Sequence, residues 1–67
     1  LFNIFVIGIL DDKNIGISAR SLGRINVGKI LEKYNGGGDE FEAGASIKGT
    51  TIKEIEGELI KIIKELD

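Results

Sequence analysis

The stretch Tyr-Asn-Gly-Gly-Gly-Asp-Glu-Phe-Glu-Ala-Gly-Ala, residues 34–45, contains three consecutive glycines, Gly36, Gly37 and Gly38. Glycine adds no side chain to a core and loses more backbone freedom on ordering than any other residue. Three in succession therefore indicate either backbone with positive φ or a group that approaches the main chain more closely than a Cβ would allow. A turn that ends a helix fits the sequence, and so does a cradle for a ligand.

The residues before the glycines predict a helix from Val27 to about Tyr34. Its apolar side chains are spaced i, i+3, i+4 and i+7 and form one stripe, made of Val27, Ile30, Leu31 and Tyr34. Asn26 is well suited to cap the start of this helix. Asn35 and Gly36 are suited to end it with left-handed backbone.

Two strands are predicted upstream of this helix. Residues 2–10 are apolar almost throughout and rich in β-branched and aromatic side chains, which is typical of a strand covered on both faces. Turn formers occupy residues 11–14, and residues 15–21 then alternate in character, so the two segments predict a β-hairpin. Arg20 and Ser21 are placed at the far end of its second strand.

The chain after the glycines predicts one more strand and one more helix. Residues 42–47 are rich in small side chains and indicate a strand against which other backbone packs closely. Thr51 followed by Glu54 fits a capping box. The helix that follows has a broad apolar face suited to packing on a sheet, made of Ile52, Ile55, Leu59, Ile60, Ile62, Ile63 and Leu66.

The element order is therefore β-β-α-β-α. We predict an α/β fold of the α+β-like kind, in which two helices pack on one face of a small mixed three-stranded sheet. The hydrophobic first strand is expected in the middle of that sheet.

Composition narrows the classes of function. The chain has 67 residues, a net charge of −2, and neither cysteine nor histidine. Disulfides, thiolate metal sites and histidine-based catalysis are therefore excluded. The scattered basic residues do not favour non-specific binding to a nucleic-acid backbone, although a local phosphate site stays open.

Length and hydropathy predict the organisation of the chain. Residues 1–67 are expected to form a single domain with a marginal core, excised from a larger protein because the chain starts without methionine. The longest apolar run is too short to cross a bilayer, so we expect a cytoplasmic protein without membrane contact.

Two motifs resemble a known family. The run Gly-Ile-Ser-Ala-Arg-Ser-Leu-Gly-Arg-Ile-Asn-Val-Gly-Lys-Ile, residues 16–30, is followed by Gly-Gly-Gly-Asp and Ala-Gly-Ala. Together they closely resemble the DHHA1 domain, the C-terminal substrate-binding domain of DHH phosphoesterases. That superfamily includes RecJ-type exonucleases, oligoribonucleases and cyclic-di-AMP phosphodiesterases, and the resemblance covers about residues 7–47.

The resemblance implies a substrate-binding role for several residues. Arg20 and Ser21 match family positions that contact a phosphate or the adjacent sugar, and an arginine offers a bidentate fork for phosphate. The three glycines, Gly36, Gly37 and Gly38, match a loop whose N–H groups approach the nucleotide. Asn26 is more typical of a helix cap, although a cap also borders an anion site.

The resemblance also implies that this chain does not cut its substrate. The metal-binding residues of the family lie in the DHH catalytic domain, where Mn²⁺ is expected, so neither catalytic residues nor a cofactor are predicted here. The expected partners are a nucleotide or short single-stranded nucleic acid and the DHH catalytic domain of the same parent chain.

Asp39 departs from the family, which has histidine at this position. Three interpretations stay open: Asp39 recognises a base edge or a ribose hydroxyl, it holds Arg20 or Arg24, or the site is partly degenerate. The nearby carboxylates Glu40 and Glu42 have no partner ligands at a recognisable spacing, so they do not predict a metal site or an acid–base pair.

We therefore predict the substrate-binding domain of a DHH-family phosphodiesterase that acts on short oligonucleotides, cyclic dinucleotides or nucleoside phosphates. The alternative is a small protein–protein assembly module without a ligand site. In that case an exposed apolar sheet face and the isoleucine-rich second helix form a homodimer, and the glycines form only a tight turn.

Overall fold

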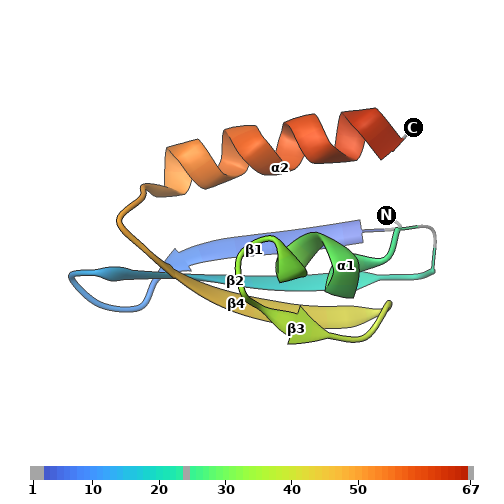
Figure 1. Cartoon of the computed structure of the whole chain (residues 1–67), viewed down its shortest axis with the longest axis horizontal. Helices are drawn as coiled ribbons and strands as arrows, with labels where there is room; N and C mark the ends of the chain where they lie inside the picture. The colour runs from blue at the N-terminus through green and yellow to red at the C-terminus, as the bar shows by residue number, and fades with distance from the viewer. Residues whose placement is uncertain (1–2, 24, 67) are drawn as a thin grey trace.

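Residues 11–14 are polar, and the chain reverses its direction here after the first strand (Figure 1). In the computed structural model, which describes residues 3–23 and 25–66, strands β1 (Asn3–Ile9) and β2 (Asn14–Ser21) form an antiparallel hairpin. The Asp11 carboxylate accepts hydrogen bonds from the backbone N–H groups of Lys13 and Asn14, at 2.9 and 3.0 Å. The bond from Lys13 foremost, and then the hydrogen bonds from the side chain and backbone of Asn14, lower the pKa of Asp11. The predicted hairpin is confirmed.

The sheet has four strands in the order β1-β2-β4-β3, and every neighbouring pair is antiparallel. β4 (Glu42–Lys48) pairs with β2, and the two-residue strand β3 (Gly37–Gly38) pairs with β4. The α/β class is confirmed, but the predicted mixed three-stranded sheet with the first strand in the middle is wrong. β2 has β1 on one side and β4 on the other, so β2 lies inside the sheet and β1 lies at its edge.

One face of β1 is open to solvent, so the expectation of a strand covered on both faces is also wrong. Ile4 is 48% exposed and Val6 is 60% exposed, whereas Phe5 and Ile7 pack against the core. Apolar side chains alone predicted burial, but coverage depends on where the helices lie.

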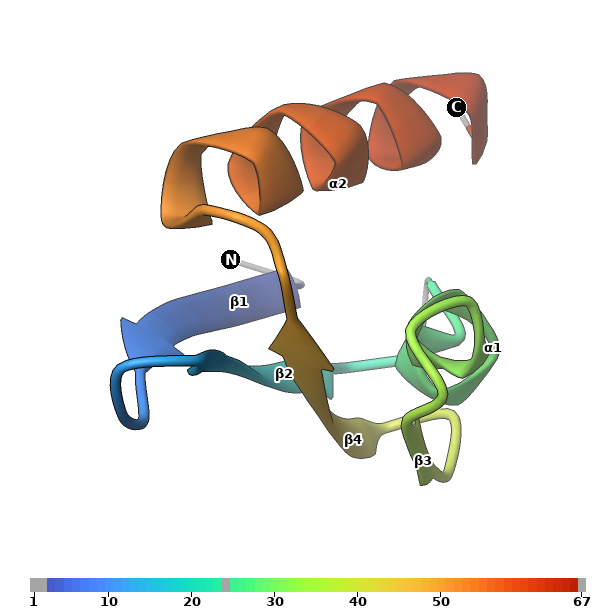
Figure 2. The same cartoon turned by 60° about the vertical axis from the view of Figure 1, so that its left-hand side comes forward.

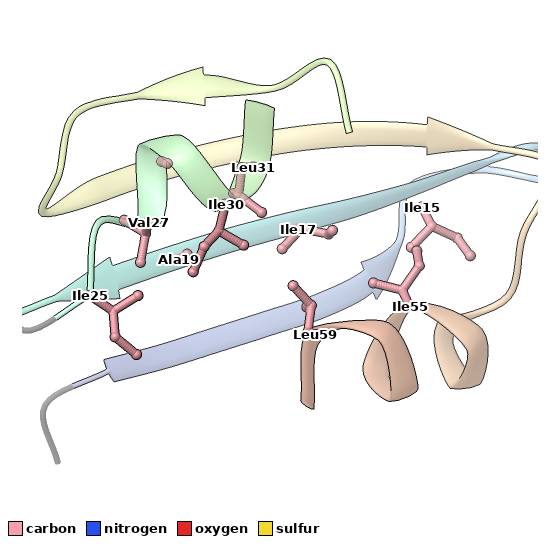
Figure 3. Close-up of a cluster of buried hydrophobic side chains, with 10 residues drawn as sticks. Ile15, Ile17, Ala19, Ile25, Val27, Ile30, Leu31, Ile55 and Leu59 are labelled. Atoms are coloured by element: carbon pink, nitrogen blue, oxygen red, sulfur yellow. The ribbon is translucent and has the colours of Figure 1, made fainter. Parts of the chain in front are cut away.

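Both helices pack on one face of the sheet, as predicted (Figures 1 and 2). α1 (Val27–Glu32) lies over β3 and β4, and α2 (Ile52–Leu66) crosses above β1. The buried side chains between the helices and the sheet form one cluster (Figure 3), made of Ile15, Ile17, Ala19, Ile25, Val27, Ile30, Leu31, Ala43, Ile55 and Leu59. Among the described residues, neither helix is long and apolar enough to span a membrane.

Polar side chains satisfy the starts of both helices. Asn26 Oδ1 accepts from the Lys29 N–H at 3.0 Å, and the Thr51 hydroxyl accepts from the Glu54 N–H at 3.2 Å. Both predicted caps are confirmed. The Glu54 carboxylate accepts from the Thr50 hydroxyl at 2.9 Å, whereas in a capping box it accepts from the backbone N–H of the cap residue. The half of the box that the structure shows is the bond from the Glu54 N–H to the Thr51 hydroxyl.

The end of α1 agrees with the prediction at one residue and differs at the next. Asn35 has a φ of 59° and supplies the left-handed turn after the helix. Gly36 does not have positive φ, so its role is different from the one expected.

The sheet face away from the helices is called the open face. Alternation along β2 buries Ile15, Ile17, Ala19 and Ser21 beneath the helices. Cross-strand partners share a face, so the pairing places the following residues on the open face: Ile4, Val6, Gly8, Gly16, Ser18, Arg20, Gly37, Glu42, Gly44 and Ser46.

Candidate functional site

Gly36 is required by contacts within the fold. A Cβ on this residue would collide with the carbonyl oxygen of Gly44 and would lie 2.6 Å from the Cβ of Ala45 and 2.9 Å from the Leu31 carbonyl oxygen. The three glycines predicted that some group comes close to the main chain. At Gly36 that group is α1 and β4 of the same chain.

The other two glycines differ from each other. Gly38 has a φ of 143°, and a Cβ there would lie 2.5 Å from the Cα of Ala43, so both the backbone angle and the space require glycine. Gly37 has neither constraint, because its φ is not positive and a Cβ would meet no atom within 4 Å. Gly37 lies on the open face, where its backbone is not screened by a side chain.

Asp39 closes the turn between β3 and β4. Its Oδ1 accepts from the N–H groups of Phe41 and Glu42, at 2.8 and 2.9 Å. Its own N–H donates to the Glu42 carbonyl at 2.8 Å. This turn role was not among the three interpretations drawn from the sequence. A contact of Asp39 with ligand stays a prediction.

The turn lies beside the start of α1. The Val27 N–H donates to the Glu40 carbonyl at 3.3 Å, and the Ser21 N–H donates to the Phe41 carbonyl at 2.8 Å. A Cβ on Gly28 would lie 2.7 Å from the Asp39 carbonyl oxygen, so glycine is needed in the helix for this contact. The sequence could not settle whether these segments meet, and the structure brings them together at one end of the sheet.

Ser21 and Arg20 point to opposite faces of the sheet. Ser21 is 6% exposed, and its hydroxyl accepts from the N–H groups of Gly23 at 3.1 Å and Ile25 at 3.4 Å. Arg20 is on the open face, with 62% of its side chain exposed. The structure therefore does not bring the two predicted phosphate contacts together, and it uses Ser21 to hold the connection to α1.

Arg20 forms an ion pair with Glu42 across the strands. The two residues are register partners in the pairing of β2 with β4, and the Glu42 side chain is 61% exposed. Arg20 is therefore not held by Asp39, and Arg24 lies outside the described residues. The local sequence patterns did not indicate Glu42 as a partner of Arg20, and the register between β2 and β4 is the signal that would have found it.

Phe41 and Asn26 complete this end of the sheet. Phe41 is half exposed, and its ring lies over Gly23, where a Cβ would be 3.3 Å from the ring edge. Asn26 is exposed, and its oxygen is engaged by the helix cap. The predicted contact of Asn26 with ligand stays a prediction.

The described residues do not form a metal centre. Within residues 3–23 and 25–66, no three histidine, cysteine, aspartate or glutamate side chains gather closely enough to hold an ion. On the open face at this end, the chemical groups are the Arg20 guanidinium, the Glu42 carboxylate beside it and exposed main chain. This set can bind and orient an anion, and it contains neither an activated nucleophile nor a positioned base.

A recess at the opposite end of the sheet contains none of the predicted site residues. It lies between the β1–β2 turn and the start of α2 and is lined by Ile9, Asp11, Asp12, Lys13, Asn14, Ile15, Lys48, Gly49, Thr50, Thr51, Ile52 and Lys53. The candidate site is therefore an exposed surface around Arg20 and not this recess.

The family is decided by a comparison over nearly the whole chain. The sequence profile of the DHHA1 domain matches residues 3–67. This chain belongs to the DHHA1 domain family. The match extends the resemblance noted in residues 7–47 to both termini of the fold, including α2.

Relatives of this DHHA1 domain are much longer proteins. It is 54% identical over 59 residues to the cyclic-di-AMP phosphodiesterase PdeA of Listeria monocytogenes, covering 88% of this chain and 9% of that protein. It is 43% identical over 61 residues to the cyclic-di-AMP phosphodiesterase GdpP of Geobacillus thermodenitrificans, covering 91% of this chain and 9% of the relative. The chain thus spans about a tenth of the length of the relatives it matches.

A solved structure supports the fold of the DHHA1 domain. The pGpG-specific phosphodiesterase PggH of Vibrio cholerae matches with a TM-score of 0.67 over 96% of this chain and 23% of that chain. The sequences are only 18% identical, so this likeness shows the arrangement of the sheet and helices.

Proposed function

We propose that this DHHA1 domain binds the phosphate of a substrate for a DHH-family phosphodiesterase, with Arg20 as the principal contact. Suitable substrates are cyclic dinucleotides, short oligonucleotides and nucleoside phosphates. The main observation behind this proposal is that the Arg20 guanidinium is exposed on the open face. It lies at the end of the sheet where the β3–β4 turn meets the start of α1. Cyclic-di-AMP phosphodiesterases among the relatives support this class of substrate.

The residues around Arg20 contribute in different ways. A guanidinium presents a planar fork of donors that suits phosphate oxygens. Gly37 leaves the main chain of β3 accessible at the same sheet face, which supports close approach by a ligand. Asp39 and Ser21 act behind this surface by fixing the two turns that carry it.

Hydrolysis is proposed to belong to the rest of the parent protein. The described residues do not gather ligands for a metal, so the DHHA1 domain does not fit Mn²⁺ by itself. A DHH catalytic domain of the same parent chain is the proposed partner, and Mn²⁺ bound there would supply an activated water. The DHHA1 domain would hold and select the substrate.

An NMR titration tests the proposal. Amide shifts of the ¹⁵N-labelled 67-residue chain are followed on addition of cyclic-di-AMP or adenosine monophosphate. We expect shifts in residues 18–20 and 37–42, lost in Arg20→Ala and kept in Lys48→Ala. Lys48 is the matched control because it is an exposed cation on the same strand as Glu42, at the opposite end. Equal losses in the two variants, or an unchanged spectrum at millimolar ligand, would refute the role of Arg20.

Assembly of two copies through β1 is the second candidate function, and the edge of β1 favours it. The Leu10 N–H donates to the Asn14 carbonyl at 2.9 Å, so alternation along the hairpin directs the main-chain groups of Phe5 and Ile7 away from β2. β1 carries no charged side chain, and a long apolar edge is a template for pairing.

Sedimentation over a range of concentrations tests assembly. Val6→Lys places a charge at the β1 edge and is expected to leave a monomer if β1 pairs between copies. Ser18→Lys places the same charge on the open face of the neighbouring strand and is the control. A wild-type chain that stays monomeric at high concentration would exclude this assembly.

A further inference from the structure

We infer that Glu42 sets the ligand selectivity of the Arg20 site, favouring a phosphate that carries a ribose over a bare phosphate ion. This inference rests on the proposed binding of phosphate by Arg20, and it concerns what else the ligand must present. The observation that carries it is the ion pair between Arg20 and Glu42 on the open face.

Glu42 is the carboxylate that the fold places beside Arg20. Its backbone is held on both sides, because its N–H donates to Asp39 Oδ1 and its carbonyl accepts from the Asp39 N–H. Its side chain is free of the turn and reaches the guanidinium. On the other side of Arg20 the register partner is Ile4, which is apolar.

The pair is exposed enough to open when a ligand arrives. Both side chains are more than half exposed, and exposed ion pairs contribute little to stability. Arg20 is therefore oriented by Glu42 before binding but is not locked. A ligand phosphate that approaches the guanidinium must still enter beside a negative charge.

That neighbouring charge distinguishes between ligands. A carboxylate only accepts hydrogen bonds, and it repels a phosphate ion. Two unit charges about 4 Å apart interact with about 1 kcal/mol in water, which is a factor of about five in affinity. Ribose hydroxyls are donors, so a nucleoside phosphate can satisfy Glu42 with its sugar while its phosphate contacts Arg20. A ligand with both groups recovers what a bare phosphate loses.

The two neighbouring acidic residues do not share this position. Asp39 uses Oδ1 in the turn, where it accepts two N–H groups. Glu40 follows Asp39 in the same turn, and its backbone carbonyl accepts a hydrogen bond from the Val27 N–H. Glu40→Gln therefore removes the same charge from the same turn without removing the partner of Arg20, and it is the matched control.

The experiment measures affinities of the 67-residue chain for three probes, by NMR titration of the amides around Arg20. The probes are inorganic phosphate, adenosine monophosphate, and its 2′,3′-dideoxy form, which lacks both ribose hydroxyls. In Glu42→Gln we expect inorganic phosphate to bind about fivefold more tightly. The preference for adenosine monophosphate over its dideoxy form should fall about threefold or more, because a hydrogen bond to a charged acceptor is lost. Glu40→Gln should change each value by less than about twofold.

Each outcome decides the inference. Equal ratios among the three probes in wild type and Glu42→Gln would overturn it while leaving phosphate binding by Arg20 intact. If neither these probes nor cyclic-di-AMP shifts the amides around Arg20 in either form, the proposed function falls and this inference with it. If cyclic-di-AMP alone shifts them, the proposed function stands and this inference falls. If Glu42→Gln fails to fold, Glu42→Thr replaces it, since threonine is well suited to a strand. Restoration of the wild-type ratios by Glu42→Asp would support selection by the carboxylate itself.

Discussion

Replacing Gly36 by alanine tests the close packing of Gly36 against α1 and β4. The added Cβ would collide with the Gly44 carbonyl and would lie 2.6 Å from the Ala45 Cβ. Both atoms belong to β4, which is paired with β2 on one side and β3 on the other, so they cannot move without shifting the sheet. Gly37→Ala is the matched control in the next position, because its Cβ would meet nothing within 4 Å.

The size of the effect follows from the packing. Forcing a methyl group into filled space costs about 1–3 kcal/mol. A chain of this length is expected to have a free energy of unfolding of about 3–10 kcal/mol, at roughly 0.05–0.15 kcal/mol per residue. Gly36→Ala should therefore remove a large part of the stability. Gly37→Ala should change it by less than about 0.5 kcal/mol, or raise it slightly by restricting the unfolded chain.

Urea and thermal denaturation, followed by circular dichroism, measure both variants. A loss of about 2 kcal/mol corresponds to a Tm lowered by roughly 8–16 °C in a domain of this size. Gly37→Ala should melt within a few degrees of wild type. Equal destabilisation by the two alanines, or a Gly36→Ala variant as stable as wild type, would refute the assignment of Gly36 to internal packing.

Three further predictions use the same measurements. Alanine usually stabilises a helix by about 1 kcal/mol relative to glycine. We expect this gain for Gly57→Ala, whose Cβ would meet open space. We expect a net loss for Gly28→Ala, whose Cβ would lie 2.7 Å from a carbonyl oxygen of the β3–β4 turn. Asp39→Ala should cost about 1–2 kcal/mol by leaving two turn N–H groups without their acceptor, whereas Asp39→Asn, which keeps an oxygen, should cost less than half of that. Burial and the hydrogen bond that the Tyr34 hydroxyl donates to a glutamate of α2 raise the pKa of Tyr34 from 10.0 to about 12. The folded chain thus holds the Tyr34 proton more tightly, so the contribution of Tyr34 to stability is full below pH 10 and is lost as the pH rises towards 12. In urea denaturation, the stability difference between wild type and Tyr34→Phe should shrink over that range. A constant difference would contradict this prediction.

Local signals predicted much of the fold because they act over a few residues. The spacing of Val27, Ile30 and Leu31 predicted α1, and these three side chains are buried on one face. Asn26 and Thr51 were predicted as caps, and each accepts an N–H three residues later. Such hydrogen bonds depend on nearby sequence, so no knowledge of the tertiary structure was needed.

The position of β1 could not be predicted in the same way. Its composition is that of a buried strand, yet Val6 is 60% exposed and the strand forms an edge. Strand order depends on which distant segment pairs with β2, and that is decided by contacts between residues far apart in the sequence. Alternation along β2 does predict that Arg20 and Ser21 occupy opposite faces, but the motif was interpreted as one contact set.

The amino-acid sequence by itself determined the order of the elements apart from the two-residue strand β3, the caps, the hairpin turn and membership of the DHHA1 family, because these depend on short motifs and periodicities. Only the tertiary structure decided which glycines are internal and which is open, since a Cβ on Gly36 meets β4 while one on Gly37 meets nothing. It also paired Arg20 with Glu42, which are 22 positions apart in the sequence but opposite each other in register. The physical reason is that strand pairing brings distant residues to contact distance, and no local pattern encodes that choice of partner.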